Sequence, residues 1–180
     1  MVEEQKPNMH YVSTREDAAE LVRNAEQFWI GDCECRSEKN GCKRSRVDVC
    51  LLFRAPTSPD STFKRKTRAD AEAILKEAEE KHLVCRPFRD DSRTKTEGSC
   101  FCCDCCCGYF REDEYSCDKG RHIEKTDMEL CTDCGECAEV CYFKARTMED
   151  GRLKVERDNC HGCGLCLDVC PVACIEMEER

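Results

Sequence analysis

The sequence predicts an α+β protein built of two parts, a small N-terminal metal-binding domain and a C-terminal module of two repeated halves. Helical and strand-like hydrophobic periods alternate along the first half of the chain. Cysteine occurs 21 times in 180 residues. The cysteines between Cys131 and Cys141 recur 29 positions later, between Cys160 and Cys170, and such a repeat indicates a pseudo-two-fold module. We expect the first domain to span residues 1–118 and the second 119–180.

Two helices and three short strands are expected in the N-terminal domain. Apolar residues at helical spacing, each set preceded by a capping hydroxyl residue, predict the two helices: residues 15–25 after Ser13 or Thr14, and residues 69–82 after Thr67. Strand-like runs occur at residues 28–30, 47–53 and 83–88. We expect residues 1–11 to form an arm or edge strand, and residues 89–98 to form a mobile polar excursion.

The densest chemical signal lies between Cys131 and Pro171. Two runs of four cysteines share the spacing C-x₂-C-x₂-C-x₃-C: Cys131, Cys134, Cys137 and Cys141, then Cys160, Cys163, Cys166 and Cys170. This spacing is typical of loops that bind iron–sulfur clusters. Zinc is the alternative, because C-x₂-C pairs also build tetrahedral zinc sites. The uninterrupted runs of four and the proline that closes the second run favour iron–sulfur.

On these two runs, residues 126–177 resemble the bacterial-type two-[4Fe-4S] ferredoxin family. The resemblance implies a ferredoxin-like βαββαβ-type module with two [4Fe-4S] clusters. The first three cysteines of such a run hold one cluster, and the fourth ligates the other. The implied ligand sets are Cys131, Cys134, Cys137 and Cys170 for cluster 1, and Cys160, Cys163, Cys166 and Cys141 for cluster 2. The first run departs from the family at Tyr142, where proline is common, but proline donates no ligand.

A second metal signal lies in the N-terminal domain, where ten cysteines gather in two stretches. They are Cys33, Cys35, Cys42 and Cys50, then Cys100, Cys102, Cys103, Cys105, Cys106 and Cys107. Soft thiolates select zinc, copper(I) or iron–sulfur, and the neighbouring ferredoxin module favours at least one further iron–sulfur cluster. One cubane needs four thiolates, so the surplus leaves open two cubanes or one cluster of non-cubane shape.

The order of these cysteines resembles an uncharacterised cysteine-rich domain that precedes dicluster ferredoxin domains in some anaerobe iron–sulfur proteins. The shared features are C-x-C-R from Cys33 to Arg36 and the dense C-x-C-C-x-C-C-C run. The resemblance implies a further cluster and attaches no activity to it. Arg36 has two interpretations, a donor of hydrogen bonds to cluster sulfur or a surface arginine.

Other residues have a structural interpretation. Cys85 lies in a strand-like run, and Cys174 stands where ferredoxins place a small apolar residue, so we expect both to be packed thiols. The sequence does not decide whether Cys117 binds metal or packs. Trp29, the only tryptophan, is expected to pack beside the site. No histidine has ligand spacing.

Charge limits the classes of partner. The net charge is −9, and from Arg111 onward 18 acidic side chains face 10 basic ones. This acidic C-terminal domain suits docking on a basic patch of a redox partner protein, and solubility explains it equally well. The basic stretch 43–68 lacks a nucleic-acid-binding signature. The charged N-terminus and the absence of an apolar run of about 20 residues predict a cytoplasmic chain without a membrane span.

These patterns predict an iron–sulfur electron-transfer protein, a carrier or the electron-transfer subunit of an anaerobic oxidoreductase. The chain shows no phosphate loop, dinucleotide fingerprint or nucleophile elbow, so a non-catalytic carrier is favoured over an enzyme. Two alternatives stay open. The N-terminal cluster is an active site that reduces a disulfide or another small substrate, or the chain delivers clusters or metal to other proteins.

Overall fold

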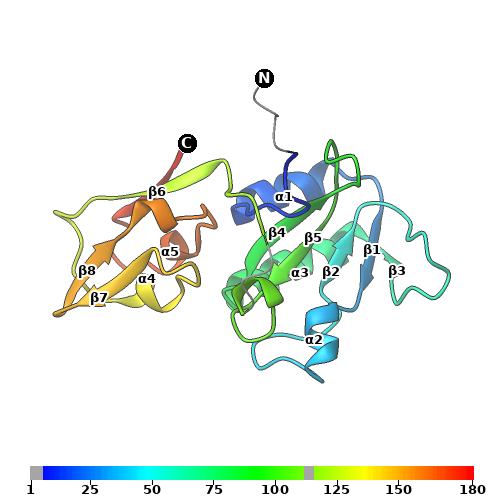
Figure 1. The fold of residues 1–180 in the computed structure, drawn as a ribbon, viewed down its shortest axis with the longest axis horizontal. Helices are drawn as coiled ribbons and strands as arrows, with labels where there is room; N and C mark the ends of the chain where they lie inside the picture. The colour runs from blue at the N-terminus through cyan, green and yellow to red at the C-terminus, as the bar shows by residue number, and fades with distance from the viewer. Residues whose placement is uncertain (1–5, 112–115) are drawn as a thin grey trace.

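The computed structural model describes residues 6–111 and 116–180, which form two lobes (Figure 1). We call residues 6–111 with 116–118 the front lobe, and residues 119–180 the C-terminal lobe. Figure 1 shows the lobes side by side, the C-terminal one in yellow to red. Small helices and antiparallel sheets occur in both, which confirms the α+β class. Among the described residues, no helix is both long and apolar enough to cross a membrane.

The front lobe is built on a five-stranded antiparallel sheet of order β3-β1-β2-β5-β4. Its strands are β1 (Phe28–Gly31), β2 (Cys50–Leu52), β3 (Lys64–Lys66), β4 (Val84–Arg89) and β5 (Thr96–Cys102). The expectation of a mobile excursion through residue 98 is wrong, because β5 begins at Thr96. Gly98 permits this pairing: a Cβ atom there would lie 2.2 Å from the carbonyl oxygen of Leu51.

Two helices cover one face of this sheet, α1 (Arg15–Asn24) and α3 (Arg68–Glu80). Each begins with a capping box, in which Thr14 or Thr67 exchanges hydrogen bonds with the aspartate three residues later. Their buried faces pack on Phe28, Ile30, Leu51 and Phe101 of the sheet. A short helix between β1 and β2, α2 (Glu34–Glu38), was not expected from the sequence.

Strand alternation sorts the cysteines between the two faces of the sheet, because successive side chains point to opposite sides. Cys85 on β4 and Phe101 on β5 face the helices and belong to the apolar core. Arg86, Cys100 and Cys102 therefore face the other side, where they line a cavity. The sheet thus separates a core packed by helices from a face that carries thiols.

The C-terminal lobe consists of two halves related by the 29-residue repeat. One sheet pairs β6 (His122–Thr126) with β9 (Ile175–Glu179), and the other pairs β7 (Arg146–Glu149) with β8 (Arg152–Val155). Each half carries one short helix, α4 (Glu136–Glu139) or α5 (Leu165–Asp168). Gly135 and Gly164 precede these helices with φ near +80°, a backbone conformation that favours glycine and turns each cysteine loop inward.

An aromatic interface joins the two lobes. Its rings are Tyr109 and Phe110 of the front lobe and Tyr142, Phe143 and His161 of the C-terminal lobe. The Phe143 and His161 rings stack with centroids 4.2 Å apart, and the Tyr142 hydroxyl donates to the carbonyl of His82 at 2.9 Å. The division of the chain at residues 118 and 119 stays a prediction.

We predict that Phe143→Ala loosens the two lobes. Phe143 is half-buried and contacts rings from both lobes, so its loss should cost roughly 2 kcal/mol, less than a fully buried phenylalanine. Small-angle scattering of the cluster-loaded chain should show a larger radius of gyration. Phe53→Ala is the matched control, because Phe53 packs on the front-lobe core away from the interface. Equal expansion of both variants would contradict the prediction.

Candidate metal centres

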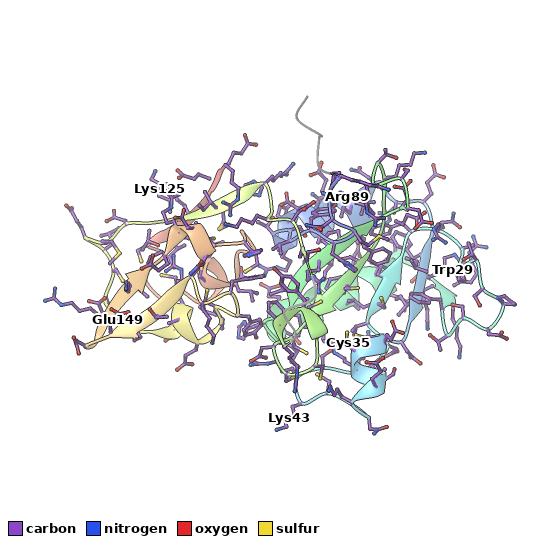
Figure 2. All side chains as sticks on the ribbon, viewed as in Figure 1. Trp29, Cys35, Lys43, Arg89, Lys125 and Glu149 are labelled. Atoms are coloured by element: carbon purple, nitrogen blue, oxygen red, sulfur yellow. The ribbon has the colours of Figure 1, made fainter. Side chains whose placement is uncertain are left out.

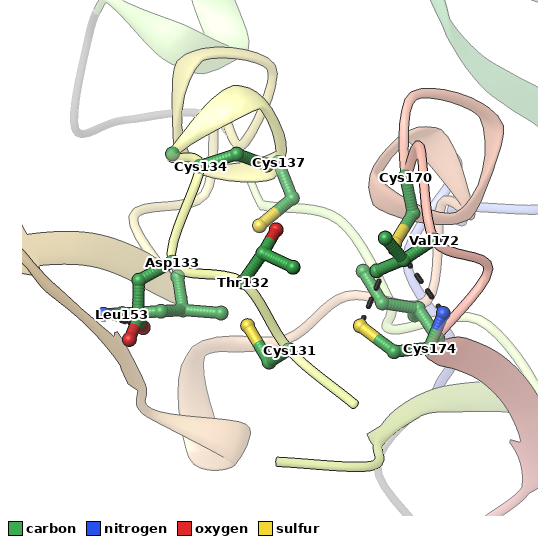
Figure 3. Close-up of a pocket in the computed structure, with 11 residues that line it drawn as sticks. Cys131, Thr132, Asp133, Cys134, Cys137, Leu153, Cys170, Val172 and Cys174 are labelled. Atoms are coloured by element: carbon green, nitrogen blue, oxygen red, sulfur yellow. Dashed lines mark hydrogen bonds between the residues drawn. The ribbon is translucent and has the colours of Figure 1, made fainter. Parts of the chain in front are cut away.

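The structure gathers the four cysteines assigned to cluster 1 around one cavity. Cys131, Cys134, Cys137 and Cys170 all line it (Figure 3). Its remaining wall includes Leu153, Val172 and Ile175, so the site is walled by sulfur and apolar groups. Soft thiolates in an apolar cavity fit a [4Fe-4S] cluster. That these four residues are the ligands stays a prediction.

The thiolate of Cys170 is held by the backbone that follows it. The N–H of Cys174 donates to the Cys170 sulfur at 3.4 Å. Burial raises the pKa of Cys170, but the N–H groups of Cys174, Val172 and Ala173 outweigh it, so its pKa is lowered. The loop after the second cysteine run therefore favours the deprotonated form that binds metal.

The four cysteines assigned to cluster 2 gather at a second cavity. Cys141, Cys160, Cys163 and Cys166 line it, together with Phe143 and His161 of the aromatic interface. The fourth cysteine of each run thus lies with the first three of the other run. This arrangement is the one that crossed ligation requires, and it places the cluster 2 cavity beside the front lobe.

A buried ion pair distinguishes the two halves. Arg146 and Glu124 are 2% and 1% exposed, they are paired, and both line the cluster 2 cavity. The repeat aligns Arg146 with Ile175 and Glu124 with Leu153, the apolar pair at the cluster 1 cavity. Arg146 also donates to the Cys137 sulfur at 3.3 Å. One guanidinium therefore touches a cysteine of the first set while it lines the second cavity.

The ten candidate cysteines of the front lobe gather at one cavity and one adjoining group of thiols. Eight of them line one cavity of about 390 Å³: Cys33, Cys35, Cys50, Cys100, Cys102, Cys103, Cys106 and Cys107. Cys33 precedes α2, Cys50 begins β2 and Cys102 ends β5, so three elements deliver thiols to the same space. We call this space the thiol cavity; Figure 2 labels Cys35 on its wall.

Arg86 is the cation of the thiol cavity. It is 4% exposed, and its Nη1 donates to the sulfurs of Cys107 at 3.1 Å and Cys102 at 3.5 Å. Burial lowers its pKa, but the neighbouring Cys102 and Cys107 outweigh this effect and raise it. Thiol contacts from Cys107 and Cys33 hold the pKa of Cys35 far below its usual value. Other thiols of the cavity have raised pKa values, as at Cys100, where Cys50 and burial disfavour the thiolate, so the cavity favours negative charge only at selected sulfurs.

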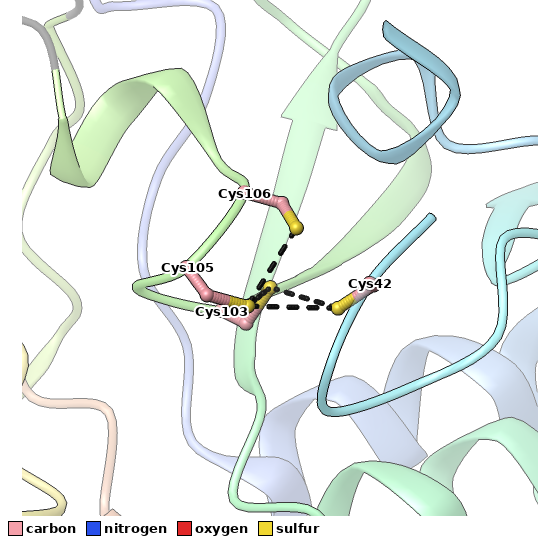
Figure 4. Close-up of side chains that lie close together, drawn as sticks. All are labelled: Cys42, Cys103, Cys105 and Cys106. Carbon is pink, nitrogen blue, oxygen red and sulfur yellow. Dashed lines mark hydrogen bonds between the residues drawn. The ribbon is translucent and has the colours of Figure 1, made fainter. Parts of the chain in front are cut away.

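The two remaining candidates, Cys42 and Cys105, join Cys103 and Cys106 in a compact group (Figure 4). Gly41, with φ of +123°, turns the chain after α2 toward the turn that follows β5. Arg36 contacts the group from its buried side. It is 1% exposed, and its Nη2 lies 3.9 Å from the Cys103 sulfur. Of its two interpretations, the structure supports the donor to sulfur and contradicts the surface residue.

The other expectations have mixed outcomes. Cys85 and Cys174 are buried as expected, and burial raises both pKa values to about 12. Cys174 also borders the cluster 1 cavity, with its sulfur 3.5 Å from that of Cys170. Cys117 is half-buried and packs at the interface. Trp29 lies on β1 and is not among the residues that line the thiol cavity, so its packing beside the site stays a prediction.

The histidines lack a ligand geometry, with one near exception. The Nε2 atom of His10 lies 4.0 Å from the Cys100 sulfur, and its ring lines the thiol cavity. Burial, aided by Arg86, lowers the pKa of His10 to about 4. His161 packs in the aromatic interface, and burial lowers its pKa to about 4 as well. Both rings are therefore neutral at pH 7.

Sequence reasoning missed three buried charged residues at these sites: Arg86, Glu124 and Arg146. For two of them, the sequence repeat contained an indication. Alignment of the repeat sets Arg146 and Glu124 against apolar partners in the other half, and a charged residue at an apolar position of a repeat indicates a special role. The sequence contained no such indication for Arg86, because its role depends on the register between β4 and β5, which no local pattern specifies.

Removal of the fourth cysteine of either run tests crossed ligation. We predict that Cys141→Ala removes the cluster held by Cys160, Cys163 and Cys166, while Cys170→Ala removes the one held by the first run. Iron counts and electron paramagnetic resonance of anaerobically prepared chain should show one of two clusters lost in each case, with different remaining signals. Cys85→Ala, a packed thiol outside both cavities, is the control. A Cys141→Ala signal that matches the signal of Cys131→Ala, and not that of Cys163→Ala, would rule out crossing.

We expect loss of one member of the ion pair to destabilise the lobe, and replacement of both members by apolar residues to restore most of its stability. Arg146→Ile leaves Glu124 buried with the partly exposed Arg157 and the Thr126 hydroxyl as partners, which should destabilise the lobe by about 3–5 kcal/mol. The double change Glu124→Leu with Arg146→Ile copies the other half and should recover most of the loss. Thermal unfolding at one fixed heating rate compares them. A double variant as unstable as the single one would refute the prediction.

Comparison with known proteins agrees with these sites. Residues 123–171 match the family model described as a 4Fe-4S dicluster domain; no curated protein matches the chain. The match supports [4Fe-4S] clusters as cofactors of the C-terminal lobe, and the thiols that line the thiol cavity fit a further cluster in the front lobe. A dicluster domain implies iron–sulfur electron transfer. The C-terminal lobe is therefore similar to the 4Fe-4S dicluster domain family.

Proposed function

We propose that the chain carries single electrons between a redox centre in the thiol cavity and a partner protein, through the two cluster sites of the C-terminal lobe. In this proposal it serves as a cytoplasmic carrier or as the electron-transfer subunit of an anaerobic oxidoreductase. Iron–sulfur clusters supply reversible one-electron chemistry. The residues of the chain supply thiolates, hydrogen bonds to sulfur, and a dry environment.

The observation that carries the proposal is the packing between the lobes. Cys102 and Cys107 of the thiol cavity share one buried cluster with Val140 and Leu165 of the C-terminal lobe, and Cys163 packs against it. Arg86 extends this contact, since its guanidinium lies 4.4 Å from the centre of the Tyr109 ring. Tyr109 in turn contacts Phe143 and His161 beside the cluster 2 cavity. Thiols of both lobes are thus connected through side chains that contact one another.

The far end of the C-terminal lobe has the features of a docking surface. Cys134 of the cluster 1 set is exposed, and Val172, which lines the same cavity, is 41% exposed. Met128 and Leu130, just before Cys131 in the chain, are more than half exposed, and the acidic Asp127 and Glu129 alternate with them in sequence. An apolar patch with acidic neighbours suits a partner with a basic rim, which accelerates encounter more than it strengthens binding.

A second candidate function rests on the size and lining of the thiol cavity. Its volume of about 390 Å³ includes His10 and Arg86 among the walls, and two polar side chains beside a metal centre can orient a small substrate. In this alternative the front lobe reduces a disulfide or another small molecule, and the C-terminal lobe supplies the electrons.

The test is a redox titration of Arg86→Gln. Removal of a charge-assisted hydrogen bond to sulfur, worth about 2 kcal/mol, should lower the potential of one centre by roughly 80 mV at about 59 mV per tenfold change. The potentials of the two C-terminal centres should not move. Potentiometric electron paramagnetic resonance measures all three.

Arg23→Gln is the matched control, because Arg23 is an exposed arginine on α1 and its loss changes the net charge equally. A chain with only two redox centres, or a shift confined to the C-terminal pair, would overturn the proposal. A spectrum of the third centre that changes when a small disulfide is added would favour the enzyme alternative.

A further inference from the structure

We infer that Cys42, Cys103, Cys105 and Cys106 form a metal site of their own, which binds one tetrahedral divalent ion, zinc or iron(II), and no cluster. This site, called here the four-thiol site, adjoins the thiol cavity through Cys103 and Cys106. The inference depends on sulfur spacing and does not depend on the electron-transfer role.

The four sulfurs are too close together for a cubane. Cys42 lies 3.6 Å from both Cys103 and Cys105. Cys105 lies 3.4 Å from Cys103 and 3.6 Å from Cys106. All four atoms lie within 4.8 Å of one another. Four sulfurs about 2.3 Å from one tetrahedral ion are separated by about 3.8 Å, which agrees with the observed contacts.

The C-terminal lobe provides an internal comparison. A [4Fe-4S] cluster places a different iron behind each ligand sulfur, so its four thiolates surround the whole cluster and stand farther apart than those of a single ion. Across residues 6–111 and 116–180, the four-thiol site is the one group of metal-binding side chains that meets the 4.8 Å spacing. The cysteines of the two dicluster cavities do not meet it. The same structure therefore contains two distinct thiol spacings.

The surroundings fit a closed structural ion. The backbone N–H of Arg44 donates to the Cys42 sulfur at 3.4 Å, and Arg36 approaches Cys103 from the buried side. Four thiolates and one divalent ion carry a net charge of −2, which the buried guanidinium of Arg36 partly offsets. Arg44 is fixed over the turn by its ion pair with Asp104 at 2.8 Å. A site closed by four protein ligands has no open position for substrate, as in structural zinc sites.

The position of the site indicates what the ion does. Cys42 follows α2, which begins directly after Cys33 and contains Cys35. The other three ligands lie on the turn between Cys102 and Cys107. One ion therefore ties together two segments about 60 residues apart in sequence. Both segments also deliver thiols to the thiol cavity. We infer that the ion positions that cavity, as a structural ion closes a long loop.

The experiment counts metal against inorganic sulfide in the anaerobically purified full chain. Clusters of the [4Fe-4S] type contain iron and sulfide in equal numbers, so the wild-type chain should hold one metal atom more than its sulfide accounts for. Cys105→Ala should lose this one excess atom. Cys85→Ala, which removes a packed thiol of the apolar core, should retain it. An excess of zinc, or of iron with a high-spin ferric resonance after oxidation, distinguishes the two ions.

Loss of iron and sulfide in equal amounts from Cys105→Ala would overturn the inference, as would a wild-type chain without excess metal. The wild-type chain also gives a test that does not depend on the folding of a variant. X-ray absorption at the edge of the excess metal should show a sulfur shell at about 2.3 Å. A second metal atom close to the absorber would assign the four thiols to a cluster instead.

Discussion

The requirement that thiolates from distant segments converge on common centres shapes this protein more than its apolar core does. The front-lobe core is limited in size, with alanine and cysteine among its buried residues, and the C-terminal lobe buries only a few apolar side chains around its cavities. Without metal, close thiols repel once they ionise, and a buried thiolate is costly. Bound metal attracts the thiolates and compensates their charge, so close and buried thiolates then stabilise the fold. Folding of the cysteine-rich segments is thus linked to metal binding, as in other small metal-bound domains.

Sequence patterns predicted the parts of the fold that depend on residues close together in the chain. The capping boxes at Thr14 and Thr67 specified where α1 and α3 begin, and the cysteine spacing specified the two inward-turned loops of the C-terminal lobe. The sorting of the front-lobe thiols could not be predicted, because it depends on the register of β5 between β2 and β4. Ten cysteines at irregular spacing permit many partitions. Only their positions in the folded chain separate Cys42 and Cys105 from Cys33 and Cys35.

The C-terminal repeat shows how one backbone can hold two unlike centres. Both halves share the loop and the glycine before the helix, yet Leu153 and Ile175 border one cavity where Glu124 and Arg146 border the other. A buried ion pair seldom adds stability over an apolar pair, so stability alone does not account for it. Hydrogen bonds and charge near sulfur do shift cluster potentials. The asymmetry therefore provides the chain with a physical means to give its two centres different potentials.

The same reasoning extends to the front lobe, where two kinds of thiol spacing share one turn. Cys103 and Cys106 line the thiol cavity and also belong to the four-thiol site. A sulfur held by the ion is no longer free for the cavity, so six of its eight thiols remain: Cys33, Cys35, Cys50, Cys100, Cys102 and Cys107. Four of these suffice for one cubane. The surplus that the sequence left unexplained thus divides between a site for one ion and a cavity where Arg86 contacts Cys102 and Cys107. Two thiols of that cavity remain beyond the four that a cubane needs.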